Sequence, residues 1–426
     1  MSDVDRIMLT PASLLFAVLG TSVQAAAQPA VDAANDAVDS IEEIRELNAI
    51  EAERLAAIDG EIAVNGPLSA DLYEMYFALA AHYQERDDNV LAVEALEQAM
   101  HIQRVAHGLF SLEQLAAMRQ LIDSARATGQ FERAAELDLQ LMRIARQNLD
   151  DVRSAAILSE AADRQMAVYE QYLAGELPPV LNINIDSGLP GRNIDSNRLL
   201  GISNLRYARR NWSIAINVLL AAGMDKDRRL VELETRLIES YYTEASAADL
   251  RGRREGLFRL GRTSYQRLLR YAIKTDDVDV ATQAMVGLAD WHLLFHRNAT
   301  ALQLYSDAWQ AMLELGVDEE RLEEIFNPEV PVVLPAFQPN PLARSPADGS
   351  ASRPADAYLN VKLVMSRYGR SRLRDLSISP DPAEETIEDR IRRIVSRSRF
   401  RPLVIDGEAQ HTAEFEFRYY VDSGDT

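Results

Sequence analysis

Two histidines, His292 and His296, lie four residues apart in a segment with helical patterning. On an α-helix this spacing brings both imidazole rings to one face, where they can bind the same metal ion. Leu293 and Leu294, however, stand where a zinc hydrolase motif has its catalytic glutamate, and no third ligand is evident. We therefore interpret His292 as a packing residue of its helix, and we expect neither a metal ion nor another cofactor.

Other catalytic chemistry has little support in the sequence. His101 and His107 flank the end of a predicted helix and are interpreted as helix-terminal or surface residues. The chain has no Walker-type phosphate loop, no Gly-X-Ser-X-Gly elbow and no glycine fingerprint for dinucleotides. It has no cysteine, which excludes thiol nucleophiles, disulfides and zinc–thiolate sites. We expect that the protein is not an enzyme.

A group of basic residues near the C-terminus is the clearest charged feature. Arginines favour the C-terminal end of a helix because of the helix dipole, and this alone can account for them. The alternative is a contact surface for an acidic partner. The acidic remainder of the chain itself can be that partner. The candidate partner-binding residues in this region are Arg390, Arg393, Arg397, Arg401 and, on the polar side of the last predicted strand, Tyr420.

The balance of charge separates this region from the rest of the chain. The 426 residues carry a formal net charge of −21, which argues against binding to nucleic acid or to an anionic membrane surface, since both require basic surface. Residues 358–421 contain 12 Lys and Arg against 10 Asp and Glu, so this part is slightly basic. We interpret the difference as a domain boundary.

The N-terminus predicts export. An apolar core over residues 12–19 follows Arg6, and Ala25 and Ala27 form an Ala-X-Ala arrangement, so residues 1–27 are interpreted as a signal peptide. The apolar run is shorter than the ~20 residues that span a bilayer comfortably. An uncleaved anchor and a cytosolic helix are the alternatives. We expect a periplasmic protein with no stable membrane insertion after signal cleavage.

A repeat of two helices follows an N-terminal helical segment, residues 28–66. Apolar and small residues recur at the relative positions 7, 8, 20, 24 and 27 of a 34-residue unit, so this part of the chain resembles the tetratricopeptide (TPR) family. The strongest copies contain Leu79, Ala80, Ala92, Leu96 and Ala99, and Leu288, Ala289, Ala301, Tyr305 and Ala308. A weaker copy has Asp138 where an apolar residue is expected.

The resemblance implies a solenoid whose concave surface binds a protein partner. From the repeat geometry, the candidate residues on that surface are Glu74, Phe77 and Gln84. We expect a repeat array over residues 67–174, a long loop over 175–199 and a second helical array over 200–325. The helix predicted at residues 153–174 has no evident partner, and 200–275 shows no clean repeat.

Proline marks the next boundary. Residues 326–356 hold seven of the 16 prolines and predict an extended spacer. Beyond it, residues 357–423 change to the period of two that β-strands require. Two strands joined by a turn at Tyr368-Gly369, a helix and a final strand predict a β-β-α-β module with a three-stranded antiparallel sheet. One break in the alternation of the second strand indicates a bulge.

This module resembles the C-terminal domain of the TonB family. The matching residues, in order, are Gly369, Arg399-Phe400-Arg401-Pro402, Gly407 and Phe417-Arg418-Tyr419-Tyr420. The resemblance implies contact with outer-membrane transporters, partly by pairing a peptide with a sheet edge. That family engages its energy source through a membrane helix that contains Ser and His, whereas the apolar segment at residues 12–19 has no His, so we expect an accessory or adaptor role.

The sequence therefore predicts a mainly α protein that acts as a periplasmic adaptor in TonB-dependent transport. The repeat array would hold one protein, and the C-terminal module would contact a transporter or the energising complex. The alternative is a general scaffold for envelope assembly, or one bound to the cell wall.

Overall fold

The computed structural model describes residues 48–174, 196–246, 254–336, 358–379, 392–393 and 395–420. Within these ranges helices form sequential pairs, and a small region with a three-stranded antiparallel sheet follows, which confirms the predicted fold class. The chain divides into two compact units, residues 1–134 and 135–426. The predicted signal peptide and Arg390 lie outside the described residues.

The first unit is built from short helical hairpins. Residues 48–65 are helical, and they precede three α-helices and a 3-10 turn. Ala80 and Ala92 are fully buried. Their small side chains let the two helices of the first hairpin approach closely, as the repeat pattern predicts. The elements are α2 (Leu72–Glu85), α3 (Asn89–His107), η1 (Leu112–Gln114) and α4 (Leu115–Ala127), and α5 (Phe131–Gln147) begins at the end of this unit.

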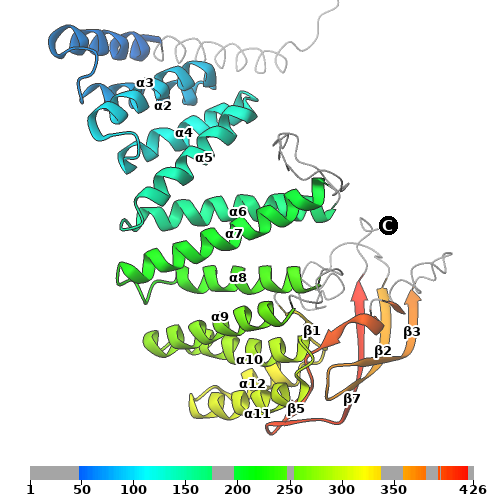
Figure 1. Cartoon of the computed structure of the whole chain (residues 1–426). Helices are drawn as coiled ribbons and strands as arrows, with labels where there is room; N and C mark the ends of the chain where they lie inside the picture. The colour runs from blue at the N-terminus through cyan, green and yellow to red at the C-terminus, as the bar shows by residue number, and fades with distance from the viewer. Residues whose placement is uncertain are drawn as a thin grey trace, which may run out of the picture. The chain divides into compact units, whose positions relative to one another are not determined.

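The second unit continues the paired helices, which Figure 1 shows in successive layers. Its helices are α6 (Arg153–Ala174), α7 (Ser196–Ala221), α8 (Arg229–Ser246), α9 (Arg254–Thr275), α10 (Val278–Leu294), α11 (Asn298–Glu314) and α12 (Glu319–Phe326). Helix α6, for which the sequence shows no evident partner, packs against α7, although residues 175–195 separate the two helices. Because α7 begins at Ser196, the end of the predicted loop is helical.

Helices α7 and α9 carry the repeat pattern that the sequence analysis missed. In each helix a small residue is followed after four positions by an aromatic residue and after three more by another buried residue. The sets are Ala208, Trp212 and Ala215 in α7, Gly261, Tyr265 and Leu268 in α9, and Ala301, Tyr305 and Ala308 in α11, all buried. Trp212 stands where the strongest copies have Leu96 or Tyr305, and Gly261 stands where they have Ala92 or Ala301, so the sequence shows no clean repeat there.

The sheet of the second unit has the order β3-β2-β7, with antiparallel neighbours. Its strands are β2 (Tyr358–Ser366), β3 (Ser371–Ser379) and β7 (Thr412–Tyr420). The predicted bulge is present, because the β2–β3 register shifts between Lys362 and Leu363. Alternate residues of β2 and β7 form the buried face, including Val361, Phe415 and Phe417. Of the predicted helix, the described residues 392–393 and 395–397 are helical.

The start of the proline-rich segment belongs to the folded unit and differs from the extended spacer that we predicted. Strand β1 (Val333–Leu334) pairs with β4 (Arg399–Phe400). Phe326 and Leu334 are buried in the same apolar cluster as helices α10 and α11. The reason is the alternation of prolines with large apolar side chains, whose burial stabilises the chain more than exposure as a spacer would.

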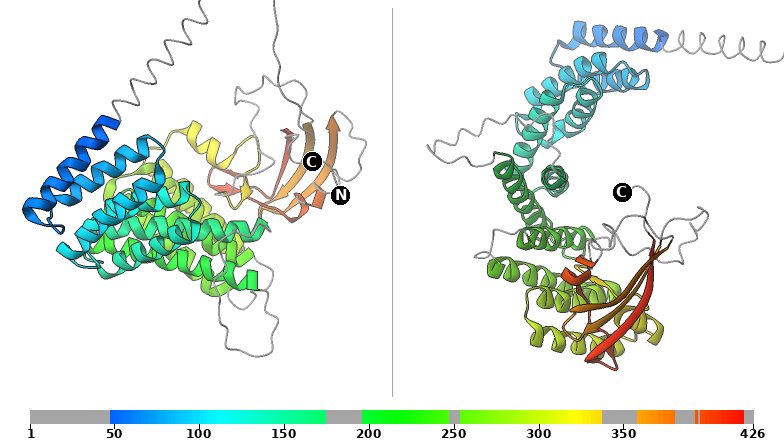
Figure 2. Two further views of the ribbon diagram at one scale, coloured as in Figure 1. Left: turned by 90° about the horizontal axis from the view of Figure 1, so that it is seen from above. Right: turned by 90° about the vertical axis from the view of Figure 1, so that its right-hand side faces the viewer.

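The C-terminal region also shares this apolar cluster. A hairpin of β5 (Val404–Ile405) and β6 (Glu408–Ala409) inserts Val404 beside α10 and α11, and Figure 2 shows the sheet beside the last helices. Gly369, in the β2–β3 turn, has a φ of +66°, and a Cβ there would lie 2.0 Å from the carbonyl oxygen of Phe400. Only glycine satisfies both demands. The C-terminal region thus packs against the last helices of the second unit.

Substitution of Gly261 tests the close packing between α9 and α10. A Cβ at this position would lie 2.2 Å from Cζ2 of the buried Trp291 ring. We expect Gly261→Ala to lower the free energy of unfolding by about 1–3 kcal/mol, the usual cost of overpacking, when measured by urea denaturation of the full chain.

Gly256, also in α9, provides the matched control. A Cβ there would meet no atom within 4 Å. Gly256→Ala is expected to leave the stability unchanged or to raise it by up to about 1 kcal/mol, because alanine favours the helix. Equal effects of the two substitutions would contradict the packing that we describe.

Candidate functional site

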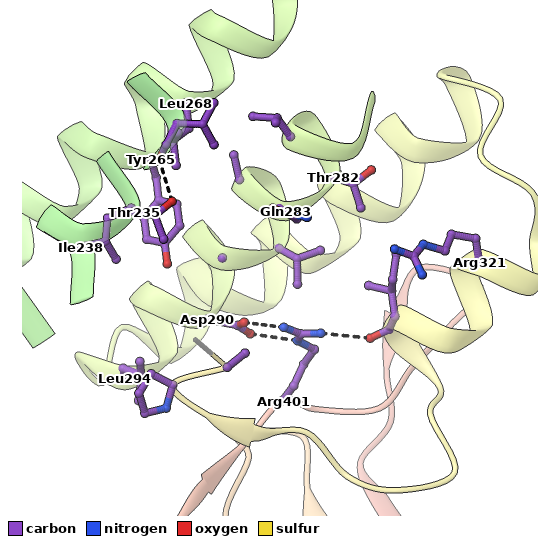
Figure 3. A pocket seen from close by; sticks show the side chains of 18 residues that line it. Thr235, Ile238, Tyr265, Leu268, Thr282, Gln283, Asp290, Leu294, Arg321 and Arg401 are labelled. Carbon is purple, nitrogen blue, oxygen red and sulfur yellow. Dashed lines mark hydrogen bonds and ion pairs between the residues drawn. The ribbon is translucent and has the colours of Figure 1, made fainter. Parts of the chain in front are cut away.

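A half-open cavity of about 300 Å³ lies in the second unit, where helices of the array meet the C-terminal region (Figure 3). Helices α8, α9, α10 and α12 supply most of the wall. Pro335 and Ala336, which follow β1, and Arg401, which follows β4, supply the rest. The cavity therefore lies where the last helices meet the C-terminal region.

A buried ion pair lies in the wall of this cavity. Arg401 donates from Nε to Oδ1 of Asp290 at 3.1 Å and from Nη2 to Oδ2 at 2.7 Å, a bidentate arrangement (Figure 3). Its Nη1 donates to the carbonyl oxygen of Ile325 at 3.3 Å. The side chains of Arg401 and Asp290 are only 13% and 7% exposed. Such a pair adds geometric specificity as well as energy.

Secondary structure places both partners. Asp290 lies on α10 next to the close-packed Ala289, and the hydroxyl of Tyr305 on α11 donates to Asp290 Oδ1 at 2.6 Å. The backbone N–H of Arg401 donates to the carbonyl oxygen of Val332 at 2.9 Å, which continues the β1–β4 pairing. Because both oxygens of Asp290 accept hydrogen bonds, the carboxylate positions Arg401 and is not presented as a free base.

The surroundings keep this site in one charge state. Burial first, and the charge of Asp290 second, raise the pKa of Tyr265 and of Tyr305, so both phenols stay neutral. Burial would by itself lower the pKa of Arg401, but Asp290 more than offsets this and the pKa is raised. The guanidinium is therefore held in its charged form.

A similar arrangement occurs earlier in the array. Asp163 on α6 accepts a hydrogen bond from the indole N–H of Trp212 on α7 at 3.0 Å. The same carboxylate is bonded by Nη1 of Arg236 on α8, at 2.6 Å to each oxygen. In both cases an aspartate joins an aromatic donor of the following helix to an arginine from a later element. At Asp290 that arginine comes from the C-terminal region instead of from a helix.

The two histidines have separate environments. His292 is 7% exposed and lies edge-on to Phe258, with 5.0 Å between ring centroids. His296 lies beyond the end of α10 with a φ of +62°, and its Nδ1 is 2.6 Å from Nη2 of Arg399. Within the described residues, no group of three or more His, Cys, Asp or Glu side chains is arranged to hold a metal ion.

The structure distributes the candidate partner-binding residues of the C-terminal region over different environments. Arg393 and Arg397 are exposed, on the helical residues before β4. Arg401 faces inwards and contacts an acidic residue of the chain's own array. Tyr420 ends β7, and its side chain lies outside the described part of the structure, as does Arg390.

The candidates on the first unit lie together on α2. Glu74 is exposed, Phe77 is half-buried and stacks on Tyr73 with 5.7 Å between centroids, and Gln84 donates to the hydroxyl of Ser124 at 2.8 Å. The sequence analysis did not identify Asp290. Its signal in the sequence was its position directly after Leu288 and Ala289, the packing pair of a strong repeat copy. A solvated acidic residue would normally stand on another face of the helix.

Searches against models of protein families and against curated proteins find no match to this chain. Within the described residues, no helix is long and apolar enough to cross a membrane.

Removal of Arg401 tests the ion pair. We expect Arg401→Ala to lower the free energy of unfolding by about 3–5 kcal/mol, because it leaves the Asp290 carboxylate buried without a counter-charge. The exposed Arg397 provides the control, and Arg397→Ala should change stability by no more than about 0.5 kcal/mol. Urea denaturation at neutral pH measures both. Equal effects would show that Arg401 is not paired in the interior.

Histidine burial predicts a pH dependence. Burial, with Arg297 and Arg262 nearby, lowers the pKa of His292 from 6.5 to about 4. The unfolded chain then binds more protons in this window, so the contribution of His292 to stability is complete above about pH 6.5 and is lost as the pH falls toward about 4. His296, whose pKa is lowered by burial and by Arg399, acts in the same direction.

His292→Leu should therefore flatten the fall in urea midpoint between neutral and acidic pH. His107→Leu, at an exposed position at the end of α3, is the matched control and should leave the slope unchanged. A slope in His292→Leu as steep as that of the unmodified chain would refute the assignment.

Proposed function

We propose that this protein is an exported, periplasmic adaptor with two protein-binding surfaces, associated with TonB-dependent transport across an outer membrane. In this proposal the helical array, which resembles TPR proteins, holds one protein. The C-terminal sheet, which resembles the TonB C-terminal domain, contacts a transporter or the complex that energises it.

The arrangement of the sheet carries the proposal. β2 is paired on both sides, whereas β3 and β7 form the two edges, and no strand among the described residues pairs with the outer side of either. An edge strand presents a row of N–H and C=O groups that an extended peptide can pair with. Strand addition is the mode of contact that the family resemblance implies.

The helical array supports the second binding surface. Stacked helix pairs present extended surfaces whose residues come from several repeats, which suits the binding of long polypeptide segments. Glu74, on the first unit, is exposed, and Phe77 is partly exposed, as a contact surface requires. These observations favour a scaffold and carry no reaction chemistry.

The docking of the sheet on the array favours an adaptor over a flexible tether. Arg401 and Val404 fix the C-terminal region to α10 and α11, so a protein bound at the sheet edges has a defined position relative to these helices. A general scaffold for envelope assembly, or one attached to the cell wall, is the second candidate, because edge pairing does not by itself select a transporter.

Photo-crosslinking at the sheet edges tests the proposal. A photoreactive phenylalanine analogue is placed at Arg372 on β3 or at Glu414 on β7, both exposed, in the full chain produced in its own envelope. We expect at least one position to crosslink to an outer-membrane transporter or to a TonB-system protein, identified by mass spectrometry.

Thr263, exposed on α9 and outside the sheet strands, is the control position and should not give that product. Point substitutions are preferable to deletion of residues 357–426, because deletion would expose the buried Asp290 and part of the apolar cluster. Crosslinks only to cell-wall or assembly factors would defeat the transport assignment and favour the second candidate.

A further inference from the structure

The cavity beside Arg401 has the chemistry of a site for apolar groups. Most of its lining is aliphatic and comes from four helices and the segment after β1: Val231, Ile238, Leu268, Val286, Ile325 and Pro335. Polar groups from Thr235 and Gln283 also line it, and both side chains are partly or fully exposed. A volume of about 300 Å³ is at the lower end for a ligand site.

The chain's own extended segment ends at this cavity. Residues Val333–Leu334 form a strand that pairs with β4, Leu334 is 5% exposed in the apolar cluster of α10 and α11, and the next residues, Pro335 and Ala336, line the cavity. The backbone N–H of Arg401 bonds to the carbonyl oxygen of Val332. An extended segment is therefore held directly before the cavity, by main-chain hydrogen bonds to the C-terminal region and by an apolar side chain buried against the helices.

The charge near the cavity limits which kinds of polypeptide segment can bind there. Helix α12, which contributes Arg321 and Ile325 to the lining, carries four exposed glutamates and one arginine. Arg321 is paired with Glu324 at 2.8 Å. None of these glutamates lines the cavity, but the charges of Glu324, Asp279 and Asp318 act on Arg321, which does. This negative charge favours basic residues in a bound segment and disfavours acidic ones.

We propose that this cavity binds apolar side chains of an extended partner segment with flanking Lys or Arg residues. Because Arg401 and Pro335 form part of the wall, the complete site exists only while the C-terminal region is docked. Binding and docking are therefore coupled: the segment stabilises the docked state, and loss of docking weakens binding by the same factor. The inference rests on the proposed role of the array in binding proteins, and it adds the site and the class of segment.

An immobilised set of decapeptides tests the site on the purified full chain. The two central residues are Leu, Phe, Ser or Glu, and the flanks are Lys or Glu. We expect binding to the peptides with Leu or Phe at the centre and Lys in the flanks. Thr235→Trp, which fills the cavity from its partly exposed rim, should weaken binding by about tenfold or more.

Thr263→Trp is the matched control. Each threonine bonds through its hydroxyl to the carbonyl oxygen four residues earlier, but Thr263 is exposed and does not line the cavity. Its substitution should leave peptide binding unchanged. Equal binding by the two variants, or no discrimination between Leu and Glu at the centre, would overturn the site.

Hydrogen exchange tests the coupling. With saturating Leu-centred peptide, the amides of residues 395–405 should exchange more slowly than in the free protein, and this slowing should disappear in Thr235→Trp. Unchanged exchange would overturn the coupling. Binding of an apolar dye, 8-anilinonaphthalene-1-sulfonate, without binding of any peptide would overturn the proposed occupant. These outcomes do not depend on the edge strands, so crosslinking at Arg372 and Glu414 fails or succeeds separately.

Discussion

The buried pair of Asp290 and Arg401 is the interaction on which the arrangement of the second unit depends. Either charge alone in this interior would be strongly destabilising, whereas the bidentate pair with the Tyr305 hydroxyl satisfies both. An arrangement that separates the C-terminal region from α10 while either charge stays buried is therefore strongly disfavoured. The main chain next to Arg401 carries this constraint to β1 and to the segment that closes the cavity.

The comparison with Asp163 explains how the array ends. There the aspartate is bonded by Trp212 and by Arg236 from a later helix of the array. At Asp290 no such helix supplies the arginine, and Arg401 of the C-terminal region bonds the carboxylate instead. Repeat arrays need a different final element to cover the last apolar surface. The β5–β6 hairpin, which inserts Val404 into the cluster of α10 and α11, meets that need.

The sequence predicted the features that depend on local spacing. Helix pairing followed from small residues such as Ala80 and Ala92, and the sheet, with its bulge and turn, followed from alternation and Gly369. The missed features depend on contacts between distant residues. Asp290 and Arg401 are 111 positions apart, so neither spacing nor composition connects them, and Arg401 was interpreted with the surface arginines around it. Proline content likewise hid the apolar residues, such as Leu334, that fold back onto the array.

The same packing divides the C-terminal region into two functional parts. Docking uses the segment from Arg399 to the β5–β6 hairpin, together with the turn at Gly369. Among the described residues, no other strand pairs with the outer edges of β3 and β7, so these edges are not used for docking. The C-terminal region buries Arg401 and Val404 on one side and keeps the main-chain edges of its sheet for pairing. It can therefore hold a partner without losing the contacts that stabilise it. This separation is the physical basis of the proposed adaptor role, in which binding at the sheet and rigidity of the last helices are independent requirements.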